Sequence, residues 1–247
     1  MHNRSPLPTC FRVFFLLFSI IALNTSCNED DNEATVTLNL QIKANDQDFA
    51  LGTTYLSPSG QAYKFDMLKF YLSHIELLNE AGVSEELSEV VWYDVENKPN
   101  IVAKIPKGNY SKLRFGLGLD AELNNSDPAD FDPGLPLSYE NNNYWSWASK
   151  YIFVKMEGKS AVDTTATPQN VFLYHLGLDE LYRTIELTSN IALSEDNESI
   201  VLTLDINKIF STPNTIDLIT EDETQSFDNL PLATKLMDNM SQSFSMQ

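Results

Sequence analysis

Two histidines stand out beyond the N-terminal apolar segment, because imidazole is the side chain that most often binds a transition metal. His74 and His175 are the only two histidines in that part of the chain. Each falls in a segment of alternating residues that predicts a strand. His74 is an even number of residues from Leu68, and His175 from Val171, so each pair is expected on the same strand face. An imidazole on an apolar strand face needs a hydrogen-bond partner or a metal. The sequence therefore leaves open two interpretations, a satisfied core histidine and a metal ligand.

Copper is one metal that suits these residues. Copper binds imidazole well, and reduced copper accepts two or three nitrogen or soft ligands. Met156 offers a thioether as a third ligand, although methionine more often fills a core. The two cysteines, Cys10 and Cys27, both lie near the N-terminus, so the remaining chain has no thiolate ligand and no disulfide. The candidate metal ligands are thus His175, His74 and Met156.

Two tryptophans flank a serine at Trp145-Ser146-Trp147. In an extended segment, side chains two residues apart point the same way, so both rings are expected on one side. They form either an aromatic core pair or a redox-active site that passes an electron to an outside oxidant. Trp92 is a weaker candidate for the second role, because it lies outside this segment.

One polar, Pro-containing stretch is rich in aspartate and contains Asp120, Asp127, Asp130 and Asp132. Carboxylate oxygens at this density can hold calcium, although their spacing does not match an EF-hand loop. The alternative is a solvated acidic loop.

Catalytic and nucleic-acid functions find no support in the chain. It contains no G-x-S-x-G, no H-E-x-x-H and no phosphate-binding glycine loop. The formal charge of the whole chain is −19, and removal of residues 1–26 makes it two units more negative, because that segment holds Arg4 and Arg12 and no acidic residue. Such a polyanion is repelled by nucleic-acid phosphates and by anionic lipid headgroups. We therefore expect a binding protein that is not an enzyme and does not bind nucleic acid.

Period-two alternation runs through most of the chain and predicts an all-β fold. Turn signals such as Pro58-Ser59-Gly60 and Lys107-Gly108-Asn109 separate the strands, which favours an antiparallel β-sandwich of about eight strands. Leu232, Leu236, Met240 and Phe244 recur every four residues and predict a C-terminal helix, with Asn229 as its cap and Pro231 in its first turn. The eight expected strands cover 35–42, 68–74, 90–94, 113–119, 151–157, 171–177, 183–187 and 200–206.

The N-terminus is typical of an exported lipoprotein. Arg4 and Arg12 precede an eleven-residue apolar run from Val13 to Leu23, which is too short to span a bilayer. Small residues then lead to Cys27, although Asn24 stands where a lipobox usually has an aliphatic residue. We expect a signal peptide at 1–26, lipidation of Cys27, an acidic tether at 27–33 and a single β-sandwich domain at 34–247. Membrane contact is then expected through the lipid anchor, with the domain in the cell envelope, at the outer membrane and facing the periplasm or the surface.

Several segments, in this order and spacing, resemble the MbnP family, named for a methanobactin-associated copper-binding protein. They are Phe70 to Ile75, Gly108 to Tyr110, Phe115 to Asp120, Trp145 to Trp147, Tyr151 to Phe153, Met156 to Gly158 and Tyr174 to Gly177. The acidic stretch after Cys27 is similar to that of surface-exported lipoproteins of Bacteroidota. The resemblance implies a β-sandwich that binds copper, and a dihaem partner of the cytochrome c peroxidase type that oxidises a tryptophan to kynurenine.

Two functions therefore follow as hypotheses. The first is a lipid-anchored, copper-binding protein matured by such a partner. The alternative is a metal-free surface lipoprotein whose exposed aromatic residues bind a glycan or a protein.

Overall fold

Strand β1 (Glu33–Ala44) illustrates how the sequence pattern builds the sheets. Its apolar residues alternate with polar ones, and Val36, Leu38 and Leu40 are buried while their neighbours are partly exposed. A computed structural model describes residues 32–246. The expected signal peptide, Cys27 and nearly all of the acidic tether lie outside the described residues. None of the helices in the described part is long and apolar enough to cross a bilayer.

The smaller sheet is built around β1. Its order is β15 (Phe244–Met246), β13 (Asn197–Asp205), β1 and β2 (Gln47–Asp48), and β6 (Ile101–Pro106) also pairs with β1. β1 and β13 are parallel, in register from Thr35 with Asn197 to Lys43 with Asp205. The all-β fold is confirmed, but this central pair departs from a wholly antiparallel sandwich. The alternation of single strands does not specify their direction relative to a distant partner.

The larger sheet follows the long strand β4 (Ala62–Leu78). Its order is β12 (Arg183–Leu193), β7 (Gly108–Leu117), β4, β10 (Val154–Ala161), β11 (Asn170–Leu176) and β14 (Glu223–Thr224). Two more strands, β3 (Tyr55–Leu56) and β5 (Ser84–Asp94), also pair with β4. Each of the eight expected strand segments overlaps a strand of the structure. Among residues 32–246, the sequence pattern did not reveal β6 and several strands of two or three residues.

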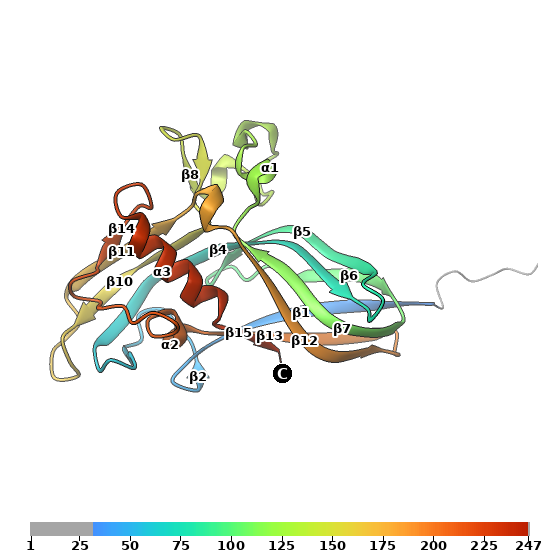
Figure 1. The fold of residues 1–247 in the computed structure, drawn as a ribbon, viewed down its shortest axis with the longest axis horizontal. Helices are drawn as coiled ribbons and strands as arrows, with labels where there is room; N and C mark the ends of the chain where they lie inside the picture. Colours follow the sequence, from blue (N-terminus) through green and yellow to red (C-terminus); the bar gives the residue numbers. More distant parts are fainter. Residues whose placement is uncertain (1–31, 247) are drawn as a thin grey trace, which may run out of the picture. The chain divides into compact units, whose positions relative to one another are not determined.

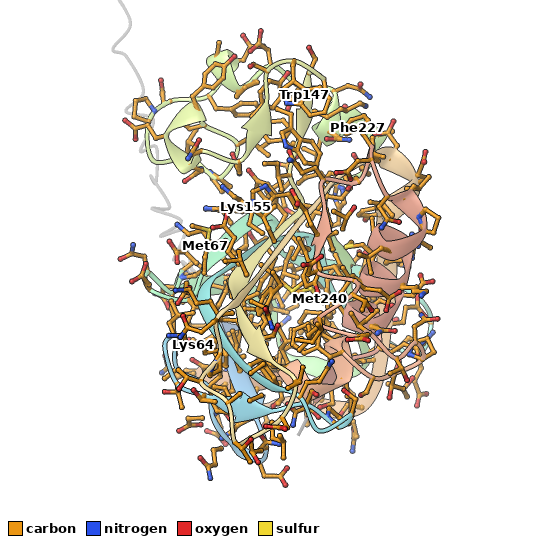
Figure 2. All side chains as sticks on the ribbon, turned by 90° about the vertical axis from the view of Figure 1, so that its left-hand side faces the viewer. Lys64, Met67, Trp147, Lys155, Phe227 and Met240 are labelled. Carbon is orange, nitrogen blue, oxygen red and sulfur yellow. The ribbon has the colours of Figure 1, made fainter. Side chains whose placement is uncertain are left out.

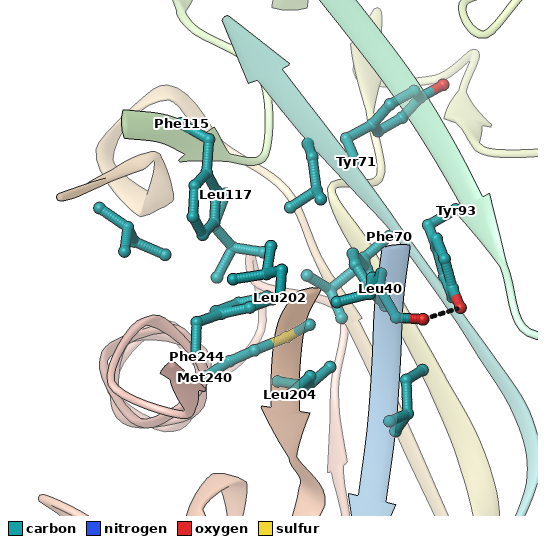
Figure 3. Close-up of a cluster of buried hydrophobic side chains, with 14 of the residues drawn as sticks. Leu40, Phe70, Tyr71, Tyr93, Phe115, Leu117, Leu202, Leu204, Met240 and Phe244 are labelled. Atoms are coloured by element: carbon teal, nitrogen blue, oxygen red, sulfur yellow. Dashed lines mark hydrogen bonds between the residues drawn. The ribbon is translucent and has the colours of Figure 1, made fainter. Parts of the chain in front are cut away.

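The hydrophobic core lies between the two sheets, as the close-up in Figure 3 shows. Leu40 and Leu202 come from the smaller sheet, and Phe70 and Phe115 from the larger one. Phe244 in β15 bridges them, with its ring centroid 5.2 Å from that of Phe115 in an edge-on contact. Burying side chains of this size stabilises the fold by about 1.5–3 kcal/mol each.

The C-terminal helix α3 (Leu230–Ser241) covers one side of this core (Figure 1). The Asn229 side chain accepts a hydrogen bond from the Leu232 backbone N–H, which confirms the expected cap. Leu232, Leu236 and Met240 are buried on the inner face. The chain leaves the helix before Phe244, which joins β15 instead of extending the helical face. A short helix α2 (Ile206–Ile209) packs beside α3.

A lobe formed by residues 119–153 projects from the larger sheet (Figure 1). It contains α1 (Ala121–Asn124), two 3-10 turns at Pro128–Asp130 and Tyr139–Asn141, and a hairpin of β8 (Tyr144–Trp145) and β9 (Lys150–Tyr151).

Candidate functional site

The lobe leaves the sheet at the point where the strand paired with one edge of β4 changes from β10 to β7. The Tyr71 N–H donates to the Phe153 carbonyl next to β10, at 2.8 Å, and the Gly118 N–H after β7 donates to the Tyr71 carbonyl, at 3.0 Å. Gly118 has a φ of +93°, and a Cβ there would lie 2.5 Å from the Phe153 ring. Only glycine therefore allows the chain to turn out of β7 this close to β10.

A buried amide holds the lobe against the sheet. Asn124, which is fully buried, accepts a hydrogen bond from the Tyr151 N–H at 2.9 Å and donates to Asp179 at 2.7 Å. The Lys150 ammonium lies 3.0 Å from the same carboxylate. Partial burial acts to raise the pKa of Asp179, but the hydrogen bonds from Asn124 and Lys150 prevail and keep that pKa below its usual range. The position of the β8–β9 hairpin thus depends on an ionised aspartate.

Three aromatic rings form a cluster at the edge of the lobe: Trp145, Trp147 and Phe227. Figure 2 labels Trp147 and Phe227, which lie next to each other. The two indole rings are 5.9 Å apart, and the Phe227 ring is 5.4 Å from Trp145 and 4.9 Å from Trp147. Trp145 is buried, whereas Trp147 is 64% exposed. The two tryptophans therefore do come together, but through the four-residue turn of a hairpin and not through an extended segment.

The aromatic cluster is joined directly to the strand that carries His175. The Ser226 hydroxyl donates to the His175 carbonyl at 3.1 Å and accepts from the Gly177 N–H at 3.0 Å. Ser226 has a φ of +65°, and Phe227 follows it into the cluster. Gly177 is required because a Cβ there would lie 2.2 Å from the Tyr151 carbonyl oxygen. The end of β11, the hairpin and Phe227 thus form one packed unit.

His175 lies on the outer face of β11, with its side chain 15% exposed. Its Nε2 is 2.8 Å from Oε1 of Glu157 on β10. Burial lowers the pKa of His175, with a smaller contribution from the Lys155 charge, and outweighs the opposing effect of Glu157. The imidazole is therefore neutral at physiological pH. Because a carboxylate oxygen accepts, the Nε2–H of His175 donates to Glu157, and the lone pair is on Nδ1.

The expectation that His175 lies on an apolar, inward strand face was wrong. Its parity partner Val171 is 60% exposed, whereas Phe172, Tyr174 and Leu176 are the buried residues of β11. Apolar residues occupy both faces of this strand, so the alternation alone does not reveal which face is the core side.

Lys155 is the cross-strand neighbour of His175 on β10. It is only 8% exposed, and its ammonium donates to the Asn142 carbonyl of the lobe at 3.0 Å. Burial lowers the pKa of Lys155. Figure 2 shows Lys155 and Met67 on the same outer face, below Trp147 and Phe227.

His74 lies elsewhere, in a β-bulge between Ser73 and Glu76. Its φ of +47° breaks the alternation, so it does not share the buried face of Leu68, contrary to the sequence expectation. Its Nε2 is 2.9 Å from Oδ2 of Asp120, and its side chain is 40% exposed. The register aligns His175 on β11 with Lys155 on β10, and Lys155 with Lys69 on β4. His175 is therefore two strands away from β4, and His74 lies five residues further along β4 than Lys69. The two imidazoles are thus roughly 15–20 Å apart.

The remaining predicted ligands are also separate from His175. Met156 is fully buried and paired with Tyr174 and Leu68, on the core side of β10. Asp120 and Asp127 cap short helices, through bonds from the Leu123 and Ala129 N–H groups. Asp130 and Asp132 are exposed, and no three His, Cys, Asp or Glu side chains among residues 32–246 gather where one ion could contact them all. The candidate calcium loop and a three-ligand His175, His74 and Met156 site are therefore not assembled.

The pair of His175 and Glu157 does fit a metal as two adjacent ligands. Bonds from a first-row metal to imidazole nitrogen and carboxylate oxygen are about 2.0–2.2 Å long, so two donors at a right angle are about 2.9 Å apart. The observed separation of Nε2 and Oε1 is 2.8 Å. This contact is a hydrogen bond, so both atoms could bind one ion only after the imidazole proton moves from Nε2 to Nδ1. Right-angled N,O ligation is the preference of Cu(II). A site with two imidazoles does not fit, because the two histidines are too far apart.

Fold and site together define a β-sandwich protein with a projecting aromatic lobe and, beside it, the partly buried pair of His175 and Glu157. A family model described as MbnP matches residues 33–231, so the chain belongs to the MbnP family. Its structure is similar to that of MbnP from Methylosinus trichosporium, with a TM-score of 0.55 and 14% identity, over 78% of this chain and 83% of that chain. At this identity the likeness establishes a shared fold. No curated protein matches the sequence.

Sequence reasoning missed three parts of this site: Glu157, Asn124 and the Ser226–Phe227 turn. The position of Glu157 could have been predicted, because it follows Met156 in the same strand and its side chain therefore points to the opposite, outer face. The contribution of Phe227 had no local signal, because it arises from a segment 80 residues beyond Trp147.

Proposed function

We propose that this MbnP-family chain is a copper-binding protein in which His175 is the principal ligand and Glu157 the second. The observation that carries the proposal is the neutral, largely buried imidazole whose Nε2 lies 2.8 Å from a carboxylate oxygen. A neutral imidazole can bind a metal through Nε2 once its single ring proton has moved to Nδ1, so no net loss of a proton is needed. A bound copper ion would supply one-electron redox chemistry beside the aromatic cluster.

The same proposal includes maturation by a dihaem partner of the cytochrome c peroxidase type, which oxidises Trp145 or Trp147 to kynurenine. Two features support it. Trp147 is 64% exposed and packs on the buried Trp145, so an outside oxidant has access to an indole pair. The chain is strongly acidic, and this charge would attract a basic docking surface on the partner.

We place the protein in the cell envelope as a lipoprotein anchored through Cys27. The support is the sequence pattern of residues 1–27, where a basic segment and an apolar run precede the cysteine. In this proposal the chain serves as a metal-handling or binding protein and not as an enzyme.

Titration of the purified, metal-free protein with Cu(II) tests the metal site, with three proteins compared side by side. We expect His175→Ala to weaken copper binding by about tenfold or more, as loss of a principal ligand does. His74→Ala is the matched control, since it removes the other histidine–carboxylate pair at a more exposed position. An unchanged isotherm for His175→Ala, or an equal loss for His74→Ala, would contradict the assignment of His175.

A further inference from the structure

A second candidate site lies between the lobe and β5, at residues different from those around His175. A cleft of about 580 Å³ is bordered by the outer face of β5, the segment 97–102 and residues 134–141 of the lobe. This volume falls in the range of small-molecule sites, about 300–1,000 Å³. None of the candidate metal ligands or the aromatic-cluster residues lines the cleft.

Trp92 gives the cleft an aromatic wall in a fixed orientation. It is paired with Tyr71 across β5 and β4, and the two ring centroids are 4.5 Å apart. The Tyr71 hydroxyl donates to the Pro136 carbonyl at 2.8 Å and accepts from the Asn143 amide, so the ring behind Trp92 is held by the lobe. Trp92 itself is only partly buried and lines the cleft.

The polar groups around Trp92 are amides and a carboxylate. Asn97 and Asn100 are exposed on one border, and Glu140 is exposed on the other. None of these three side chains forms a hydrogen bond to another group within residues 32–246. Asn141 in contrast uses its amide nitrogen to bind the Leu135 and Pro136 carbonyls, which shapes the border from the lobe side. The cleft therefore offers both donors and acceptors that have no partner in the part of the chain that the structure describes.

The charge of the cleft argues against a charged ligand. Lys69 is the lining cation, and its ammonium is 2.8 Å from the Asp94 carboxylate, so the two charges compensate. Glu140 then leaves the border slightly negative. An anion is disfavoured by this carboxylate and by the overall acidic charge, and a lipophilic ligand is disfavoured by the amides.

We propose that this cleft binds a neutral sugar, one pyranose unit of an oligosaccharide, with a C–H face of the ring on Trp92. The face of an indole carries partial negative charge and attracts the weakly positive C–H bonds of a pyranose. The hydroxyls around the ring exchange hydrogen bonds with Asn97, Asn100 and Glu140. This inference goes beyond the proposed copper function and does not depend on it.

The experiment uses the full-length protein, stripped of metal by a chelator and kept in the chelator throughout. It is titrated calorimetrically with four neutral hexasaccharides built from glucose in α and in β linkage, from mannose and from xylose. A hexamer of galacturonic acid provides the charged comparison. We expect at least one neutral oligosaccharide to bind, and Trp92→Ala to weaken that binding by about tenfold or more.

Two kinds of variant keep the result interpretable. Trp147→Ala removes the more exposed tryptophan of the aromatic cluster and should leave sugar binding unchanged. Asn100→Ala and Glu140→Gln change exposed residues whose side chains form no hydrogen bond within residues 32–246, so they test the cleft even if Trp92→Ala fails to fold. Each should weaken binding severalfold. The inference is overturned if no neutral sugar binds, if only the acidic hexamer binds, or if binding is lost in Trp147→Ala and kept in Asn100→Ala and Glu140→Gln.

Discussion

His175 and Glu157 meet diagonally across β10 and β11. The register places His175 opposite Lys155 and Glu157 opposite Leu173, yet Nε2 of the histidine and Oε1 of the glutamate are 2.8 Å apart. Diagonal neighbours on a sheet are within reach of long side chains. Lys155, the direct partner of His175, directs its own ammonium to the Asn142 carbonyl. The imidazole is thereby oriented by a residue that is not its direct cross-strand partner.

Glu157→Gln is expected to weaken copper binding by about tenfold while the fold is retained. The amide keeps the size and a hydrogen bond to the imidazole, but it removes the negative charge and the carboxylate donor. Copper titration of the variant measures the change. Glu89→Gln, at an exposed position of β5, is the control and should bind as the unaltered protein does. Equal affinity in all three proteins would show that Glu157 is no ligand.

Gly177→Ala should disturb the packing between β11 and the hairpin. The added Cβ would lie 2.2 Å from the Tyr151 carbonyl oxygen, so strand and hairpin must separate, at an expected loss of about 1–3 kcal/mol of unfolding free energy. Near-UV circular dichroism should also change, because Trp145 and Trp147 sit on that hairpin.

Gly60→Ala separates this effect from backbone strain. Gly60 has a φ of +88° with open space around it, so its substitution costs about 1–2 kcal/mol through conformation alone. The tryptophan signal should stay the same in that control. An unaltered tryptophan signal in Gly177→Ala as well would mean that the hairpin does not depend on this close contact.

Asp179 should make the attachment of the lobe pH-dependent. Its folded pKa is below the usual value, so the ionised form stabilises the folded state. That contribution is present in full above the unfolded pKa of about 4 and is lost as pH falls through the lower folded value. Asp179→Asn should therefore be less stable than the unaltered protein at pH 7, with the difference shrinking toward pH 3.

Chemical denaturation at the two pH values measures this difference. Asp130→Asn, an exposed aspartate of the same lobe, is the control and should differ little from the unaltered protein at either pH. A stability difference for Asp179→Asn that is constant with pH would contradict the electrostatic explanation.

The sequence could predict the secondary-structure elements better than the tertiary contacts between them. Alternation located the strands, and Asn229 marked the start of the C-terminal helix, because both signals are local. The bulge at His74 is a one-residue irregularity with no sequence mark other than the residue itself, and it reversed the expected face. The contact of Phe227 with the tryptophans depends on the tertiary fold alone. The strands that carry the candidate ligands were thus predicted correctly, but the ligand side chains do not lie together at one site.

Cys27→Ala should block lipidation. The short apolar segment before Cys27 predicts export followed by acylation of this cysteine. Without the thiol, the protein should be released in soluble form or remain as an uncleaved precursor. Membrane fractionation combined with intact-mass measurement distinguishes these forms. A variant that stays with the membrane and has the mass of the unaltered protein, apart from the substitution, would contradict lipid anchoring.

Protein isolated from its native host is expected to carry kynurenine at Trp145 or Trp147. An indole is hard to oxidise, and beyond Cys27 the chain has no cysteine for a C-x-x-C-H haem motif, so the oxidant must come from a partner. Conversion adds two oxygen atoms and then removes the formyl group by hydrolysis, for a net gain of about 4 mass units. Trp147, at 64% exposure and in contact with Trp145, gives the partner access to both rings. Association with the partner should weaken as salt is added, because the chain is strongly acidic.

Peptide mass spectrometry of native and recombinant protein decides this last point. The peptide that contains Trp145 and Trp147 should show the mass gain only in the native sample. Trp92 provides an internal control, since its ring packs against Tyr71 outside the aromatic cluster and it should stay unmodified in both samples. Unmodified tryptophan at both positions, with copper still bound, would retain the metal site and eliminate the maturation step. A mass gain in recombinant protein made without the partner would instead show that copper and oxygen suffice for the oxidation.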